Sequence, residues 1–328
     1  MTPESALLRV IHCLDRAHVG GFKTKAFVRA LDVVRNTDPV ELAERARDET
    51  LTDLEGIGDS SAAVITEALA GVEPTYVAKL ERETQIPMSE EGAQYRAALR
   101  GDCHLHSRWS DGGYEIEQMA ATAIELGHEY MVLTDHSARL TVAHGLDEVE
   151  RINGSITAAG HDFRILTGME VDILEDGGLD LRDSMLERLD VVVASVHSKL
   201  RMERSAMTER MIMAVASPHV DILGHCTGRL IGKRPESQFD ADFVFAACKQ
   251  FNTAVEINCR PERLDPPREL LRLAVDYGCW FSIDSDAHAT GQLEWQPHGC
   301  DRAADAGIPI DKIVNTMPAD ELLAWAAA

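Results

Sequence analysis

The chain lacks several features that would assign it to common classes of protein. Its 328 residues contain no apolar run of about 18 residues, so no transmembrane helix is expected. The seven cysteines are odd in number and form no C-x-x-C, which argues against a disulfide framework or a thiolate zinc site. The first residues have neither a basic n-region nor a small-residue cleavage site. We therefore expect a cytoplasmic protein with no membrane partner.

Basic residues are also scarce. The chain has 32 Lys and Arg residues against 55 Asp and Glu residues, which gives a formal net charge of -23. Such a surface repels nucleic acid phosphates and anionic lipids unless bound cations reverse the charge locally. Solubility alone also explains an acidic composition, so the charge bears on partners and not on the fold.

Residues 5 to about 85 have helical periodicity and no strand pattern. Apolar residues recur at helical spacing in four segments. These segments are residues 5–17, 22–36, 38–49 and 60–71. A Pro and an acidic run then precede Gly101 and have the composition of a linker. We predict a small all-α domain over residues 1–95 and a second domain over residues 96–328.

Short apolar runs separated by helical stretches follow from residue 101. The seven runs are GDCHLH, YMVLTDH, RILTGMEVDI, DVVVASVH, VDILGH, TAVEINC and WFSIDSDAH. Strands that alternate with helices indicate parallel βαβ units, and continuous apolar cores are typical of strands buried on both faces. An open doubly wound sheet would give a similar pattern. The polar residues at the ends of the runs favour a seven-stranded (β/α) barrel.

Six of the seven runs end in side chains that bind metal ions. In a barrel, the carboxyl ends of all strands meet at one mouth. The nine candidate ligands are His104, His106, Asp111, His136, Glu170, His197, His225, Asp286 and His288. One such histidine is usually structural, but six histidines and three carboxylates exceed what packing requires, because buried charge is costly unless paired or metal-bound. Imidazole and carboxylate suit Zn²⁺, Mn²⁺ or Fe²⁺, so we predict two or three divalent ions.

The same residues lie in motifs that resemble those of the PHP (polymerase and histidinol phosphatase) superfamily. The motifs are H-L-H (104–106), W-S-D-G (109–112), L-T-D-H-S (133–137), G-M-E-V-D-I-L (168–174), S-V-H-S (195–198), I-L-G-H (222–225) and D-S-D-A-H (284–288). Residues 228–235 and 256–265 make the chain most similar to the C-terminal PHP domain of bacterial family X DNA polymerases. The resemblance covers essentially all of residues 101–328 and implies a distorted seven-stranded barrel with a trinuclear metal site.

The resemblance also implies how the ions share the nine ligands. One ion would be held by His104, His106, Glu170 and Asp286. A second ion would share Glu170 and add His197 and His225. The third ion would be held by Asp111, His136 and His288. Every ligand position of the family site is filled by an ordinary ligand type.

Hydrolysis of a phosphoester by metal-activated hydroxide is the reaction that such a site implies. Arg presents a planar fork to phosphate oxygens, so cations in two loops are candidates for binding the substrate phosphate, unless structural ion pairs occupy them. These cations are Arg229, Lys233, Arg234, Arg260 and Arg263, of which Arg229 and Arg263 are preferred. His144, in a loop expected to open onto the mouth, is a candidate general acid for the leaving group.

The N-terminal region resembles the small helical domain of family X polymerases. Residues 54–65 (LEGIGDSSAAVI) resemble a helix-hairpin-helix, whose turn presents backbone amides to a DNA phosphate. The polymerase palm is absent, because only about 15 residues join the two domains. Asp59, Ser60 and Val64 stand where DNA-binding relatives commonly place small polar or Lys residues, including the Lys that forms a Schiff base in lyase members. Residues 1–100 hold 12 basic against 17 acidic residues. We expect neither polymerase nor lyase activity, and at most weak DNA binding.

Three functions remain open from the sequence. The acidic surface favours a phosphatase that acts on a small phosphorylated substrate, in the manner of histidinol phosphatases. The resemblance to polymerase-type PHP domains implies a 3′-5′ exonuclease or a 3′-end-processing phosphoesterase instead. A non-catalytic binding or regulatory module is the third alternative, and the complete ligand set opposes it. The sequence does not bear on the oligomeric state.

Overall fold

The computed structural model describes residues 1–19, 21–137 and 142–328, with side chains described from residue 146 onward in the last range. The chain forms two compact units, Met1–Ile86 with Thr290–Gln292, and Pro87–Ala289 with Leu293–Ala328. Helix α6 (Glu90–Ala98) belongs to the second unit, where Tyr95 Oη donates a hydrogen bond to the carbonyl of Ile308 (2.8 Å). The predicted boundary near residue 95 thus lies inside a helix.

The first unit is entirely helical, as predicted. Its elements are α1 (Pro3–Arg16), α2 (Phe22–Asn36), α3 (Pro39–Arg47), the short 3-10 helix η1 (Leu51–Asp53), α4 (Asp59–Leu69) and α5 (Thr75–Glu83). Thr2 caps α1, since its side chain accepts a hydrogen bond from Ser5 N (3.1 Å). Leu7, Val10 and Leu14 form one buried stripe of α1, which packs against α2, α4 and α5.

The turn of the predicted helix-hairpin-helix is present between η1 and α4. Ile57 N donates a hydrogen bond to the carbonyl of Leu54 (3.0 Å), which closes the turn. Gly56 has φ of +102°, a conformation that a side chain would strain. Gly58 is the N-cap of α4, and Asp59 therefore stands at the first position of the helix. A carboxylate at this position competes with a phosphate for the positive end of the helix dipole.

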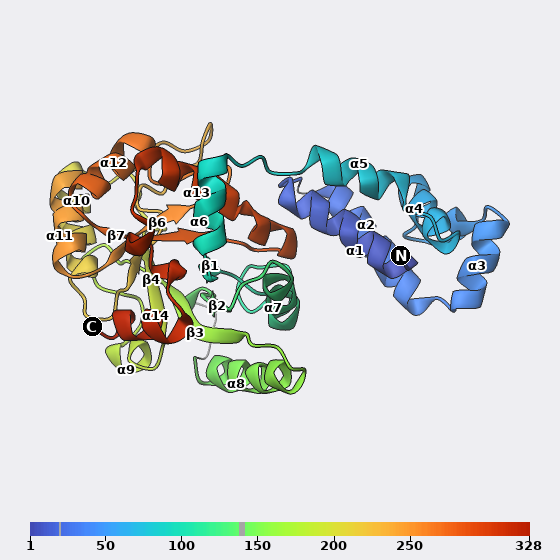
Figure 1. The fold of residues 1–328 in the computed structure, drawn as a ribbon, viewed down its shortest axis with the longest axis horizontal. Coiled ribbons are helices and arrows are strands. Elements are labelled where there is room, and N and C mark those ends of the chain that lie inside the picture. Colours follow the sequence, from blue (N-terminus) through green and yellow to red (C-terminus); the bar gives the residue numbers. More distant parts are fainter. Residues whose placement is uncertain (20, 138–141) are drawn as a thin grey trace. The chain divides into compact units, whose positions relative to one another are not determined.

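The second unit contains a single sheet of seven parallel strands in the order of the chain (Figure 1). The strands are β1 (Gly101–Leu105), β2 (Tyr130–Leu133), β3 (Arg164–Asp172), β4 (Val191–Ser195), β5 (Ile222–Leu223), β6 (Ala254–Asn258) and β7 (Trp280–Asp284). A parallel bridge between Leu105 and Ala287 joins the end of β1 to the segment after β7. The sheet is thereby curled into a nearly closed barrel, which confirms the predicted fold.

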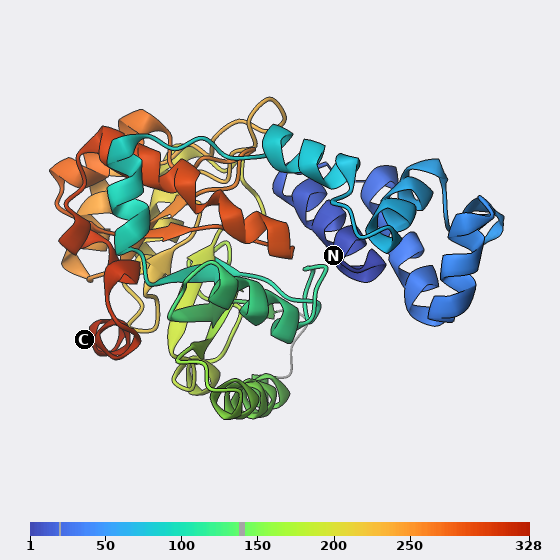
Figure 2. The ribbon, with the colours of Figure 1, turned by 45° about the vertical axis from the view of Figure 1, so that its right-hand side comes forward.

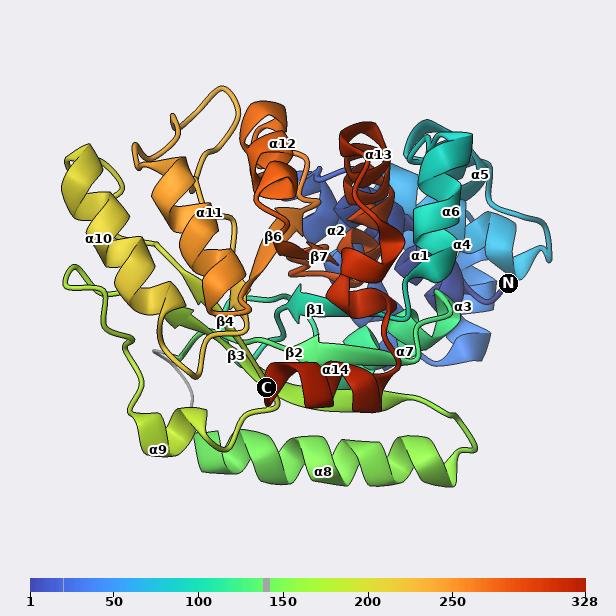
Figure 3. The ribbon, with the colours of Figure 1, turned by 60° about the vertical axis from the view of Figure 1, so that its left-hand side comes forward.

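Helices follow the strands and cover the outside of the barrel. They are α7 (Ile116–Glu125), α8 (Val142–Ala158), α9 (Asp183–Leu186), α10 (Arg204–Val215), α11 (Ala241–Gln250), α12 (Arg268–Asp276), α13 (Gln296–Ala306) and α14 (Ala319–Ala326). Three 3-10 helices follow β7, namely η3 (Thr290–Trp295), η4 (Ile310–Lys312) and η5 (Val314–Thr316). Helices α10 to α13 lie side by side in Figure 3, and the two green helices α7 and α8 are neighbours in Figure 2.

The strands are buried on both faces, as the continuous apolar runs predicted. One apolar cluster lies between the first strands and helices α7 and α8, and it includes Leu105, Met131 and Ile152. A second cluster extends under several strands to α14, where Leu322 is fully buried. Within the described ranges, no helix combines the length and the apolar character that crossing a membrane requires. Both clusters pack against the strands, so the strand ends can position polar side chains.

Candidate metal centre

The nine predicted ligands come together at the carboxyl ends of the strands. They lie on β1, β3 and the segments that follow β1, β2, β4, β5 and β7. Backbone pairing fixes their spacing: Asp286 N donates to the carbonyl of His104 (2.9 Å), and His136 forms a parallel bridge with Glu170. His104 and Asp286, 182 residues apart in sequence, thus become neighbours only because the barrel nearly closes. The sequence prediction that these nine side chains share one mouth agrees with this geometry.

Glu170 lies at the middle of the group and is 1% exposed. Its Oε1 atom lies 3.0 Å from His225 Nε2 and 3.2 Å from His197 Nε2. Its Oε2 atom faces His136 Nδ1 at 3.2 Å and His104 Nε2 at 3.4 Å, and the Nε2 atom of His106 is 3.5 Å away. One carboxylate therefore presents its two oxygens to two different sets of imidazoles, as a bridging ligand does.

Asp111 forms the centre of a more exposed group. Its Oδ2 atom lies 3.3 Å from His288 Nε2 and 3.6 Å from His136 Nε2. The loop that carries Asp111 is held by Asp135, whose Oδ1 accepts a hydrogen bond from Ser110 Oγ (2.5 Å). Asp111 itself is 42% exposed, so this side of the centre opens to solvent. A substrate can reach the centre from this side.

Divalent metal ions suit this donor set. Ligand atoms within 4.8 Å of one another occur in three overlapping groups: His106, Asp111, His136 and His288; His104, His106 and Asp286; His136, Glu170 and His197. The buried atoms His104 Nε2, both ring nitrogens of His106 and Glu170 Oε1 make no hydrogen bond within the described part of the chain. Buried polar atoms without partners are rare unless an ion or water satisfies them. The residues therefore fit a metal centre, while the number of ions and the sharing of ligands remain predictions.

Burial and neighbouring charges shift the pKa values in this group. Burial alone would raise the pKa of Glu170, but the imidazoles beside it, His104 first, hold it well below its ordinary value. Burial is the main cause that lowers the pKa of His106 to about 4. Burial would also lower the pKa of His104, yet Glu256 and Glu170 raise it well above its ordinary value. An ionised carboxylate beside a neutral imidazole is ready to bind a cation, whereas a proton on His104 must first leave.

Two carboxylates behind the ligands were missed by the sequence analysis. Asp172 Oδ1 lies 2.5 Å from His197 Nδ1, on the side of the ring opposite Glu170. Glu256 Oε1 lies 2.6 Å from His104 Nδ1 in the same arrangement. Signals for both were present in the sequence, since each is an acid within a strand that is otherwise mostly apolar. Such carboxylates orient histidine ligands and make them more basic.

Two of the predicted phosphate-binding cations face the centre. Arg263 Nε lies 3.2 Å from Asp286 Oδ2, and Arg260 Nη1 lies 3.8 Å from Asp286 Oδ1. Their side chains are only 13% and 18% exposed, so both guanidinium groups are turned toward the barrel. The Nη1 atom of Arg263 is buried and makes no hydrogen bond within the described residues.

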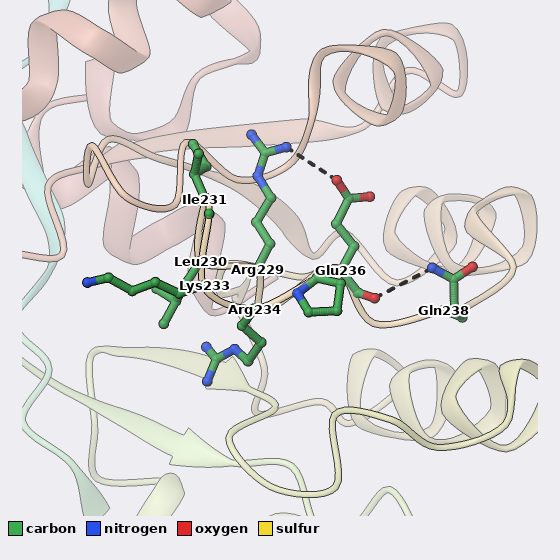
Figure 4. A pocket seen from close by; sticks show the side chains of 9 residues that line it. Arg229, Leu230, Ile231, Lys233, Arg234, Glu236 and Gln238 are labelled. Atoms are coloured by element: carbon green, nitrogen blue, oxygen red, sulfur yellow. Dashed lines mark hydrogen bonds and ion pairs between the residues drawn. The ribbon is translucent and has the colours of Figure 1, made fainter.

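Arg229 has a different environment. Its Nε donates a hydrogen bond to the carbonyl of Arg263 (2.7 Å) and its Nη2 to that of Leu264 (2.5 Å). Its Nη1 lies 3.3 Å from Glu236 Oε1, the ion pair drawn in Figure 4. The guanidinium thus joins the loop after β5 to the loop after β6. The geometry therefore supports a role for Arg229 in holding the loop that carries Arg263. A direct contact of Arg229 with phosphate stays a prediction.

Lys233 and Arg234 belong to the same loop as Arg229. Residues 229–236 and Gln238 line a hollow of about 650 Å³ (Figure 4). Arg234 Nε donates to the carbonyl of Gly228 (2.7 Å), and burial followed by the charge of Arg263 lowers the pKa of Arg234. Lys233 is exposed and points away from Arg229 (Figure 4). The charge of Arg263, which faces Asp286, therefore acts on Arg234.

His144, the predicted general acid, falls outside the residues whose side chains the structure describes. Its backbone belongs to α8, near the start of that helix. The prediction for His144 is therefore neither supported nor opposed by geometry.

Comparisons with known proteins point to one family. The PHP domain model matches residues 102–260. The DNA polymerase/3′-5′ exonuclease PolX of Bacillus subtilis is 37% identical over 233 residues, which cover 69% of this chain and 41% of PolX. A probable phosphatase of Aliivibrio fischeri is 27% identical over 232 residues, covering 67% of this chain and 90% of that protein. A probable phosphatase of Thermoanaerobacter is 29% identical over 235 residues, with 66% and 89% covered.

A solved structure is also similar to the chain. It is histidinol phosphate phosphatase from Lactococcus lactis complexed with zinc, L-histidinol and phosphate, with 18% identity, a TM-score of 0.48, and coverage of 64% of this chain and 95% of that one. The chain spans less than half the length of PolX but most of the length of the probable phosphatases. The matched segment contains β1 to β6 and seven of the nine candidate ligands. The chain therefore carries a PHP domain.

Proposed function

We propose that the chain is a metal-dependent phosphoester hydrolase that acts on a small phosphorylated substrate. The observation that carries the proposal is the group of nine candidate ligands, with the buried Glu170 at its middle. Divalent ions bound there neutralise phosphate oxygens and lower the pKa of water toward neutrality. The reaction class, phosphoester hydrolysis, also agrees with the family and with the relatives named as probable phosphatases.

The protein side chains have separate tasks in this proposal. Glu170 holds the two sets of imidazoles at fixed separation, because each oxygen faces its own set. Arg263, with Arg260 beside it, binds the phosphate oxygens that face away from the ligands. The exposed side of Asp111 admits the substrate. His144 remains the predicted donor of a proton to the leaving oxygen.

A small substrate is favoured over nucleic acid by charge. The net charge of -23 opposes the approach of a polyanion to any surface that lacks a local excess of cations. In the helix-hairpin-helix, Asp59 places a carboxylate where a DNA phosphate would meet the start of α4. The probable phosphatases match this chain over about nine-tenths of their own length. These observations support a phosphatase, and histidinol phosphate is the first substrate to assay.

A nuclease is the second candidate, and the identity with PolX favours it. PolX is named as a 3′-5′ exonuclease, and the identity of 37% is the highest of the relatives described above. In that case the substrate would be a DNA 3′ end and the helical domain would contact the strand weakly. Non-catalytic binding is the third candidate, and the complete ligand set opposes it.

A substrate panel tests the proposal. Purified protein with added Mn²⁺ is assayed with p-nitrophenyl phosphate, histidinol phosphate and single-stranded DNA, and bound metal is counted. We expect at least two ions per chain and faster turnover of the small substrates. Glu170→Gln and His104→Ala should abolish turnover with the circular dichroism spectrum preserved, whereas Glu150→Gln, an exposed control on α8, should not. Full activity of Glu170→Gln, or turnover of DNA alone, would overturn the proposal.

A further inference from the structure

The one barrel strand without a predicted ligand carries a buried acid. Glu256 lies in the middle of β6, between β5 and β7, and is 0% exposed. A buried carboxylate is destabilising by several kcal/mol unless hydrogen bonds or opposite charge compensate it. The strand alternation directs Glu256 to the inside of the barrel, the side on which the ligands lie. The groups that Glu256 contacts inside the barrel must therefore compensate its burial.

Both oxygens of Glu256 lie within hydrogen-bond distance of candidate ligands of the metal centre. Oε1 lies 2.6 Å from the Nδ1 atom of His104, on β1. Oε2 accepts a hydrogen bond from the backbone N–H of His225, which follows β5. Two histidines predicted as ligands of different ions are therefore joined through one carboxylate. Because an ionised carboxylate only accepts hydrogen bonds, the Nδ1 atom of His104 must carry a proton.

The protonated Nδ1 determines what the other ring nitrogen can do. In neutral imidazole, the form that binds a metal ion, one nitrogen is a donor and the other has a free lone pair. Once His104 is neutral, a proton held on Nδ1 therefore leaves the lone pair on Nε2. That Nε2 atom is buried, makes no hydrogen bond with the residues that the structure describes and faces Glu170 Oε2 at 3.4 Å. The ring is thus oriented with its coordinating nitrogen toward the centre.

We propose that Glu256 is a positioning residue of the metal centre, which holds His104 in the tautomer that can coordinate and fixes the backbone of His225. This inference rests on the proposed function, since it requires that ions bind at the centre. His197 has a comparable partner in Asp172, at 2.5 Å. Asp172 is 41% exposed, however, whereas Glu256 is fully buried. Water can therefore replace the hydrogen bond of Asp172 to His197 more easily than that of Glu256 to His104.

Glu256→Gln is the sharpest perturbation because it keeps the shape and removes one acceptor. An amide has one oxygen and one NH₂ group, whereas Glu256 faces two N–H donors. If the amide oxygen takes the His225 N–H, the NH₂ group meets His104 Nδ1 and favours the tautomer with a proton on Nε2. If the amide turns over, two donors meet at His225 instead. We expect Mn²⁺ affinity to fall about 10- to 100-fold at the weakest-held site, the usual effect of losing such a partner.

Two further variants separate hydrogen bonding from packing. Glu256→Asp keeps both acceptor oxygens on a shorter side chain, so its Mn²⁺ affinity should lie between those of the wild type and Glu256→Gln. A purely structural requirement for volume would give the reverse order, because Gln fills the space and Asp does not. Asp221→Asn is the matched control. Asp221 is also largely buried and accepts a hydrogen bond from the backbone N–H of Val192 (2.7 Å), but among the described residues it has no hydrogen bond to a candidate ligand. Its affinity should equal that of the wild type.

The measurement is a competition titration of Mn²⁺ against a fluorescent chelator, with ions counted and folding checked by circular dichroism. Weaker binding in the order wild type, Glu256→Asp, Glu256→Gln supports the inference. Wild-type affinity in Glu256→Gln overturns it, and so does the reverse order of the two variants. Wild-type protein that binds no ion refutes the proposed function and this inference together, whereas bound ions that ignore Glu256 refute only the inference.

Discussion

Arg263 offers the most direct test of how the substrate phosphate is bound. Its guanidinium is largely buried and lies 3.2 Å from a carboxylate oxygen of Asp286, and its Nη1 atom makes no hydrogen bond in the described part of the chain. Arg263→Met removes the charge and the donors while it retains an unbranched side chain of similar reach. Asp286 keeps Arg260 and His106 as neighbours, at 3.8 and 3.6 Å, so the ligand set should remain in place.

The size of the effect follows from the burial of this side chain. Two unit charges about 4 Å apart attract by about 4 kcal/mol at an effective dielectric constant of about 20. Desolvation, and the charge that Arg260 still supplies, reduce the net loss to that of one charge-assisted hydrogen bond, about 1.5–3 kcal/mol. Because each 1.4 kcal/mol is tenfold, inorganic phosphate should bind roughly 10- to 150-fold more weakly to Arg263→Met.

Competitive inhibition by inorganic phosphate measures this directly. The inhibition constant is determined against p-nitrophenyl phosphate at a fixed, saturating Mn²⁺ concentration, so that metal loss does not contribute. Arg272→Met is the control, since Arg272 is an exposed arginine on α12. An unchanged inhibition constant in Arg263→Met would refute the assignment. An equal increase in both variants would mean that the net charge of the protein, and not this contact, governs phosphate binding.

Two further predictions concern stability. Burial raises the pKa of Asp221 from 3.8 to about 7, so between about pH 4 and 7 the folded state holds a proton that the unfolded chain has released. The free energy of unfolding should therefore fall as the pH rises through this range. In urea unfolding at pH 5 and pH 8, Asp221→Asn should abolish this fall. An equal fall in the variant and the wild type would refute the raised pKa. Leu322→Ala, at a fully buried site of α14, should lower the free energy of unfolding by about 2–4 kcal/mol and leave phosphate affinity unchanged. A smaller loss would mean that neighbouring side chains relax into the cavity.

The strands and most of the centre were predictable because two signals coincide in the sequence. A strand buried on both faces needs a continuous apolar run, so a His or Asp at its end is conspicuous, as in VVVASVH before His197. The order of parallel strands then brings those ends to one mouth. Helix α1 was equally clear, since its apolar stripe and the Thr2 cap agree. Local patterns were sufficient wherever they did not depend on a distant partner.

Residues whose importance depends on distant contacts were missed or left open. Glu256 is one acid in an apolar run, and only the nearly closed barrel shows that it reaches His104, 152 residues away. Arg229 and Arg263 looked equivalent in sequence, but one guanidinium is engaged by backbone carbonyls while the other faces Asp286. Nor does the linker-like composition before Gly101 reveal that α6 packs on the barrel. These distinctions follow from side-chain direction in three dimensions, which periodicity does not encode.

The salt dependence of KM should separate a small-molecule phosphatase from a nuclease. For a chain of charge -23, the long-range field repels any anionic substrate, and only the contacts at the mouth attract it. Raising ionic strength from 0.01 to 0.15 M shortens the Debye length from about 30 to about 8 Å, which screens the distant repulsion more than the close attraction. KM for p-nitrophenyl phosphate should therefore fall or stay level as KCl is added. A nuclease with three phosphate contacts would instead lose roughly 300-fold in affinity for single-stranded DNA over the same range. If KM for the small substrate rose steeply with salt, a basic surface beyond Arg260 and Arg263 would be required, and the preference for a small substrate would be wrong.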